Sequence, residues 1–162
     1  MSDIFTLWVN FVLSREGGLT NDANDPGGLT NFGIDQRSHP QVDIRHLTRD
    51  QAVEIYRTSY WQASHADKLP PPVALVYADA AVNQGLGEAA RLLQQALDVT
   101  VDGAIGPATL AAVARHDPAA LATEFTARRV LRYAETDHRA DFGLGWMRRA
   151  QAALALALWL PA

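Results

Sequence analysis

Apolar residues recur at helical spacing along most of this chain, and one long stretch rich in glycine, asparagine and aspartate interrupts that period. The pattern begins at Ile4, and Gly17 predicts that the first helix ends near Glu16. From Gly17 to Gly33 the composition predicts a long structured loop with short strands, and loops of this length inside a compact domain are often functional. The periodicity therefore predicts a mainly α fold with one irregular loop after the first helix.

Start and stop signals place the later helices. Thr48 and Gln51 have the capping-box spacing, and Pro72 can occupy the first turn of a helix. Gly85 and Gly87 separate two helices, so we expect two lobes that share one globule, residues 1–85 and 86–162. The predicted helices after the loop cover residues 48–60, 72–83, 88–97, 107–115, 118–135 and 145–159.

Composition excludes several classes of protein. The 162 residues contain no cysteine, so disulfides, thiolate metal sites and a cysteine nucleophile are impossible. The formal net charge is −4 and no basic face is visible, which argues against a nucleic-acid partner. The longest apolar run, residues 152–160, is too short for an integral membrane segment. The five histidines lack metal-ligand spacing, and no metal or cofactor is expected.

The stretch from Glu16 to Ile34, EGGLTNDANDPGGLTNFGI, carries most of the chemical information. Glu16 stands at the predicted C-terminal end of an apolar helix, where the helix dipole disfavours a negative charge. A neutral carboxylic acid can protonate a leaving oxygen, which is what glycoside hydrolysis requires. Gly17 and Gly18 have no side chains and leave room for a bulky polymer. Glu16 is therefore the candidate general acid, although a glutamate near a helix end is also an ordinary surface residue.

A second group must stabilise the cationic transition state or activate water, and two carboxylates lie nearby in the sequence. Asp25 precedes Pro26 and two glycines, a tight turn that can fix the direction of its side chain. Asp22 is the alternative, and the sequence does not decide between them. Thr30 can position a water molecule. Each of these residues also has an ordinary explanation as part of a turn.

This stretch resembles the N-terminal signature of glycoside hydrolase family 108, the phage-type and secretion-associated N-acetylmuramidases. Other stretches look like the same family and follow in the expected order. They are Tyr60-Trp61, Asn83-Gln84-Gly85, and the pairing of residues 101–109 (VDGAIGPAT) with residues 145–149 (GWMRR). The last pair is similar to the peptidoglycan-binding half that follows the catalytic half in this family.

The resemblance implies a lysozyme-like helical fold and cleavage of the β-1,4 bond between N-acetylmuramic acid and N-acetylglucosamine. It implies that Glu16 is the catalytic acid, that residues 1–85 are the catalytic half, and that residues 86–162 bind peptidoglycan. Asp25 follows Glu16 by nine residues, which is similar to the Glu–Asp pair of phage lysozymes. Thr30 departs from that pattern by one residue, and Asn31 stands at the matching offset.

The expected partner is the glycan strand of peptidoglycan, and the expected protein is a monomeric, bacteriolytic muramidase of the endolysin type. No signal peptide is apparent at the start of the sequence. We therefore expect synthesis in the cytoplasm and action on the cell wall after release by a holin or a secretion helper.

Four further residues are candidates for binding substrate. Tyr60 and Trp61 can stack on sugar faces, and core packing explains them about as well. Asn83 and Gln84 can hydrogen-bond N-acetyl groups, and helix termination explains them nearly as well. Two other functions stay open, a non-catalytic wall-binding protein and a lytic transglycosylase, which also uses one glutamate but makes anhydro sugars.

Overall fold

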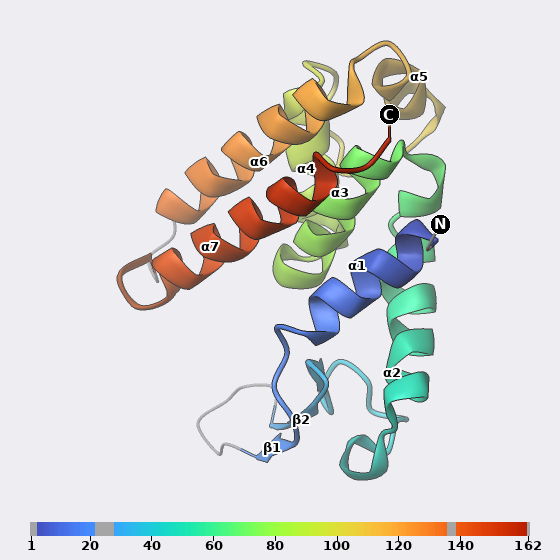
Figure 1. Ribbon diagram of the computed structural model, residues 1–162, viewed down its shortest axis with the longest axis vertical. Coiled ribbons are helices and arrows are strands. Elements are labelled where there is room, and N and C mark those ends of the chain that lie inside the picture. The colour runs from blue at the N-terminus through green and yellow to red at the C-terminus, as the bar shows by residue number, and fades with distance from the viewer. Residues whose placement is uncertain (1–2, 22–27, 136–138, 162) are drawn as a thin grey trace. The chain divides into compact units, whose positions relative to one another are not determined.

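The computed structural model describes residues 3–21, 28–135 and 139–161. The chain forms two compact units, Met1–Ser59 and Tyr60–Ala162, called unit 1 and unit 2 below. In Figure 1, unit 1 runs from blue to teal and unit 2 from green to red. The division of function after Gly85 stays a prediction, because these units describe packing and not chemistry.

Helix α1 (Ile4–Leu13) opens unit 1, and it ends three residues earlier than the sequence predicted. The hydroxyl of Ser14 donates to the carbonyl of Phe11, and the backbone N–H groups of Arg15 and Glu16 both donate to the carbonyl of Val12. These bonds tighten the chain into a turn before the glycines are reached, so Glu16 lies beyond the helix. The buried face of α1 carries Phe5, Trp8, Val9 and Val12.

Three short strands form an antiparallel sheet in the order β1-β2-β3, which confirms the strands expected in the irregular stretch. They are β1 (Thr20–Asn21), β2 (Leu29–Asn31) and β3 (Ile34–Asp35). Thr30 pairs with Thr20 on one side and with Asp35 on the other, so these three residues share one face of the sheet. Asn31 and Ile34 occupy the opposite face and are buried.

The helix predicted to start at Thr48 is α2 (Arg49–Tyr56), and its capping box is confirmed. The backbone N–H of Gln51 donates to the Thr48 hydroxyl, while the Gln51 side chain accepts from the Thr48 backbone N–H at 2.9 Å. Beyond Tyr56 the helix widens into a π-helical stretch, η2 (Arg57–Gln62). A short 3₁₀ helix, η1 (Ile44–His46), precedes α2.

Unit 2 is built around α3 (Pro71–Gln84), whose residues from Pro72 to Ala81 are all buried. It packs against α4 (Leu86–Ala96), α6 (Pro118–Ala134) and α7 (Arg139–Ala157), and α6 and α7 lie side by side in Figure 1. A helix buried on all sides should be largely apolar, and the sequence of α3 agrees except at Asp79, its one charged residue. The short elements are η3 (Ala66–Lys68) and α5 (Pro107–Val113).

The start of α7 was predicted at Gly145, and this was wrong, because the helix already begins at Arg139. A glycine inside a helix costs about 1 kcal/mol relative to alanine, so sequence rules place a boundary there. Contacts of α7 with α3 and α6 outweigh that cost. The prediction of a mainly α, lysozyme-like fold is confirmed. Within the described residues, no helix is both long enough and apolar enough to cross a bilayer.

Candidate functional site

Glu16 lies half-buried in unit 1, and its side chain rests against the backbone of Gly33. A Cβ atom on Gly33 would stand 2.6 Å from Cγ of Glu16 and 2.7 Å from both Cδ and Oε2. Distances under 3.0 Å essentially never occur for a real Cβ, so only glycine allows this approach. The sequence interpretation missed Gly33, because the contact joins residues that are far apart in the chain.

Gly33 belongs to a two-residue turn that joins β2 to β3. Phe32 has φ 53° and Gly33 has φ 75°, and positive values at both central positions are typical of the type I′ turns of tight hairpins. The hydroxyl of Tyr56 donates to the carbonyl of Phe32 at 2.9 Å. The Tyr56 ring also meets Trp8 edge-on, with ring centroids 6.0 Å apart. Residues of α1 and α2 therefore hold the turn against which Glu16 lies.

The other residues predicted for the catalytic site lie in different surroundings or outside the described residues. Thr30 is half-buried in the middle strand of the sheet. Asp25, and its alternative Asp22, lie outside the described residues. Asn31 is buried, and its side-chain amide donates to the carbonyls of Ile44 in η1 and of Leu47. These bonds anchor the sheet to the segment before α2.

Asp35 is a carboxylate that the sequence interpretation did not single out. It shares a sheet face with Thr30. Partial burial acts to raise the pKa of Asp35, but hydrogen bonds from Ser38 outweigh burial and leave that pKa below its usual range. The backbone N–H of Ser38 donates to Oδ1 of Asp35 at 2.8 Å. Strand alternation was the only signal available, and it required the register of the hairpin.

Unit 2 contains the four residues predicted to bind substrate. Tyr60 and Trp61 lie in η2, where Tyr60 is half-buried and Trp61 is 5% exposed. A sugar ring can therefore reach Tyr60, while Trp61 packs mainly into the core. Asn83 and Gln84 end α3, and both line one pocket of about 230 Å³.

The described residues that line this pocket all belong to unit 2. Glu88 comes from the first turn of α4, Arg132 and Tyr133 from the last turn of α6, and Trp146 from α7. Trp146 is half-buried at the pocket. Its ring centroid lies 5.4 Å from that of Tyr133. Sequence spacing cannot bring the ends of α3 and α6 together, so the pocket as a whole was not predictable.

The motif at residues 101–109 is organised by a buried side chain that the sequence interpretation overlooked, Gln94 of α4. Its amide nitrogen donates to Oδ1 of Asp102 at 2.6 Å and to the carbonyl of Ala104, and its oxygen accepts from the N–H of Gly103. The bond from Gln94 is the main reason that the pKa of Asp102 is lowered. The backbone N–H of Ala104 also donates to Oδ1 of Asp102, so this carboxylate closes a turn.

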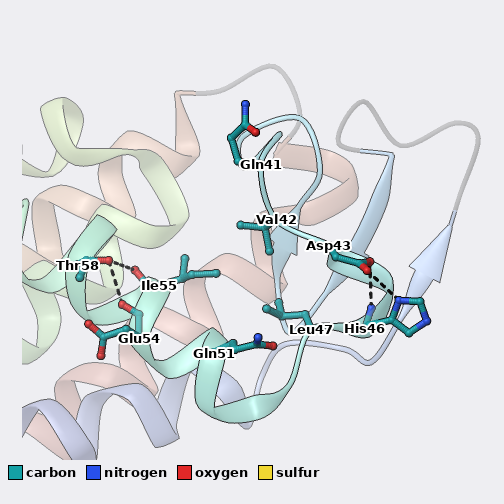
Figure 2. Close-up of a pocket in the computed structure, with 9 residues that line it drawn as sticks. All are labelled: Gln41, Val42, Asp43, His46, Leu47, Gln51, Glu54, Ile55 and Thr58. Carbon is teal, nitrogen blue, oxygen red and sulfur yellow. Dashed lines mark hydrogen bonds and ion pairs between the residues drawn. The ribbon is translucent and has the colours of Figure 1, made fainter.

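A larger pocket, of about 520 Å³, lies in unit 1, and Figure 2 shows its lining. None of the predicted site residues that the structure describes lines it. Asp43 and His46 stand at one end, 2.9 Å apart, and Glu54 stands at the other. Glu54 is paired with Arg57 at 3.6 Å. The carboxylates already have basic partners, so we do not place the acid chemistry here. Nor does any group of three or more potential metal ligands occur in the described part of the chain.

Comparisons with known proteins agree with this layout. The family model described as "Glycosyl hydrolase 108" matches residues 9–85, and the model described as "Predicted Peptidoglycan domain" matches residues 88–151. The solved structure titled "Structure of Brucella abortus SagA" is 31% identical, with a TM-score of 0.86 over 96% of this chain and 94% of that chain. The chain belongs to glycoside hydrolase family 108. A search of curated proteins finds no match.

Membership of family 108 gives the contacts around Glu16 a chemical context. The matched segment, residues 9–85, contains the glutamate, the turn that holds it and the end of α3. The second matched segment contains α4, α5, α6 and most of α7. A family 108 chain with such a second segment is a hydrolase or a binder of peptidoglycan.

Proposed function

We propose that this protein is a muramidase, which hydrolyses the β-1,4 bond between N-acetylmuramic acid and N-acetylglucosamine with Glu16 as the proton donor. One observation carries the proposal. In a chain of family 108, the single glutamate of the EGG motif is fixed against a glycine turn, at a distance that no other residue type at position 33 permits. A general acid must be held within a few tenths of an ångström to act, and this contact supplies such a restraint.

In the proposed reaction, protonated Glu16 donates its proton to the glycosidic oxygen as the bond to the anomeric carbon breaks. The sugar passes through an oxocarbenium-like state, and water supplies the hydroxyl that completes hydrolysis. The proton lost by that water restores the acid over one cycle. Asp25 is proposed to stabilise the developing positive charge or to orient the water, and Thr30 to help position it.

The four predicted binding residues complete the proposal. Tyr60 and Trp61 would support a sugar ring, with the half-buried Tyr60 as the more accessible member of the pair. Asn83 and Gln84 would hydrogen-bond the glycan. Delivery to the wall by a holin or a secretion helper, and a monomeric state, stay predictions.

The test is Glu16→Gln, which keeps the size of the side chain but removes the proton donor. Purified peptidoglycan is incubated with folded variant protein, and new reducing ends are counted. We expect a loss of at least about a hundredfold, because general acid catalysis contributes about 10²–10⁴ in rate. Glu54→Gln is the matched control, since Glu54 is an exposed glutamate of the same unit. It should cut walls at the wild-type rate.

Three results would count against the proposal. Wild-type-like cutting by Glu16→Gln would remove the assigned acid. Anhydro sugars in the mass spectrum of the fragments would make the protein a lytic transglycosylase. Wall binding by the wild type without any release of reducing ends would make it a non-catalytic binder.

A further inference from the structure

The pocket at the ends of α3 and α6 has a polar lining whose donors and acceptors can be assigned. From this lining we infer that the pocket is a subsite for an N-acetylhexosamine and that it reads the acetamido group. The inference rests on the proposed function only in that the glycan is the expected ligand. All of the groups involved lie in unit 2.

The orientation of the Asn83 amide is set by a chain of buried groups. Nε of Arg129 donates to the hydroxyl of Tyr133 at 2.8 Å, and NH1 of Arg129 donates to Asp79 at 2.8 Å. Arginine can only donate, so the Tyr133 hydroxyl accepts from it and must send its own proton elsewhere. That proton goes to Oδ1 of Asn83. The remaining group of Asn83, the Nδ2 donor, makes no hydrogen bond with another described residue.

Gln84 supplies the complementary group. Its Oε1 is buried and has no hydrogen-bond partner among the described residues. A buried acceptor without a partner costs about 1–3 kcal/mol, so folded proteins rarely keep one without a use. Gln84 lines the pocket and the terminal torsion of a glutamine side chain is broad, so we place this oxygen at the pocket after rotation about that torsion. The pocket therefore offers one donor and one acceptor from adjacent residues.

An acetamido group carries the matching pair, one carbonyl oxygen and one N–H. We place its carbonyl at Nδ2 of Asn83 and its N–H at Oε1 of Gln84. A free amine in its protonated form has no acceptor for Nδ2 of Asn83, so two donors would face one another. The pocket should therefore select N-acetylated sugars over sugars whose acetyl group has been removed.

The rest of the lining fits a sugar and not an ion. Trp146 is half-buried and offers an aromatic surface for the apolar face of the ring or for the acetyl methyl group. Among the described residues that line the pocket, Glu88 and Arg132 are charged, and they pair with each other at 2.7 Å. Because their charges offset one another, this pair favours neither a cation nor an anion. A volume of about 230 Å³ suits one sugar residue and its substituent better than a longer chain.

The first arm of the test compares two soluble probes. The full chain carrying Glu16→Gln is titrated calorimetrically with the β-1,4 trimer of N-acetylglucosamine and with the same trimer of glucosamine at mildly acid pH. We expect the N-acetylated trimer to bind at least about tenfold more tightly, because losing one such hydrogen bond leaves a buried group unpaired. Equal affinity for the two trimers would overturn the inference.

The second arm assigns the preference to this pocket. Gln84→Leu removes an acceptor that has no partner in the protein, so its melting temperature should equal or exceed that of the parent, while its affinity for the N-acetylated trimer falls about tenfold. Gln95→Leu, on the exposed side of α4, is the matched control and should change neither quantity. Unchanged trimer affinity in Gln84→Leu would refute the assignment.

A third variant does not depend on replacing a polar side chain by an apolar one. Asn83→Asp has the same shape and keeps an oxygen for Tyr133, but it replaces the Nδ2 donor by an acceptor. We expect the preference to reverse in favour of the glucosamine trimer, and an unaltered preference would overturn the inference. Failure of this pocket and failure of the muramidase proposal are distinguishable, because wall cutting by the wild type is measured separately from trimer binding.

Discussion

Gly33→Ala is the sharpest test of how the fold positions the proposed acid. An added methyl group would stand 2.6 Å from Cγ of Glu16, whereas ordinary van der Waals contact begins near 3.4 Å. The contact must therefore open by about 0.8 Å, and the flexible side chain of Glu16 yields more easily than the hairpin backbone. We expect the variant to fold with its carboxyl group displaced.

The size of the effect follows from two separate costs. Misplacing a catalytic group by about 1 Å can cost about a hundredfold in rate, or about 2.7 kcal/mol of transition-state stabilisation. Alanine in the left-handed region also costs about 1–2 kcal/mol of folding stability, which corresponds to a few degrees in melting temperature for a chain of this size. Gly28→Ala isolates the cost in folding stability, because Gly28 has φ 71° and no described residue lies within 4 Å of its Cβ position.

The assay is the initial rate of reducing-end release from purified walls, measured together with the melting temperature. Both alanine variants should lose similar stability, and only Gly33→Ala should lose about a hundredfold in rate, mainly in kcat. In a Glu16→Gln background, Gly33→Ala should have little further effect, because the group that it displaces no longer donates a proton. Equal rates for the two single glycine variants would refute the positioning argument.

Three other substitutions test the packing around the two sites. Asp79→Ala leaves the buried Arg129 and the half-buried Arg149 without their shared carboxylate and should cost about 3–5 kcal/mol in urea denaturation, whereas Glu124→Ala, which breaks an exposed pair, should cost less than about 0.5 kcal/mol. Tyr56→Phe removes the hydrogen bond to the turn carbonyl at Phe32 and should cost about 1 kcal/mol by the same measurement, and a cost near zero would show that the turn is held by other contacts. Asp102 has a folded-state pKa below its ordinary value of 3.8, so its contribution to stability is present above that pH and is lost as pH falls through the folded pKa. The melting temperature of Asp102→Asn should therefore fall less steeply than that of wild type below pH 3.8, and parallel curves would contradict this.

Local signals in the sequence predicted much of the fold, because helix starts depend on residues that are neighbours in the chain. The capping box at Thr48 and the helix break near Gly85 both appear where the sequence placed them. The two helix ends that were predicted wrongly depend on interactions that sequence spacing does not encode. The end of α1 follows backbone hydrogen bonds to Val12, and the start of α7 follows its packing against α3 and α6. Neither the bonds nor the packing has a signature in sequence spacing.

At the candidate site, the sequence was enough to predict the reactive carboxyl group, whereas the residues that hold it in place could be identified only from the structure. Glu16 was identifiable from its motif, whereas Gly33 and Tyr56 matter because the hairpin and α2 fold back on the segment after α1. The same holds in unit 2. Asn83 was a candidate from sequence, but the direction of its amide depends on Tyr133, fifty residues further along.

The charged residues linked through Tyr133 to the amide of Asn83 support a functional interpretation of the pocket in unit 2. Asp79 is fully buried and meets both Arg129 and Arg149, and well-packed apolar residues would often hold such helices together at least as well. What apolar residues cannot do is fix the direction of a hydroxyl proton. Arg129 does so for Tyr133, and Tyr133 in turn fixes the amide of Asn83. Replacing the charged set by apolar residues of similar volume should therefore preserve or raise stability and reduce the preference for N-acetylated glycan, a combination that a purely structural network would not produce.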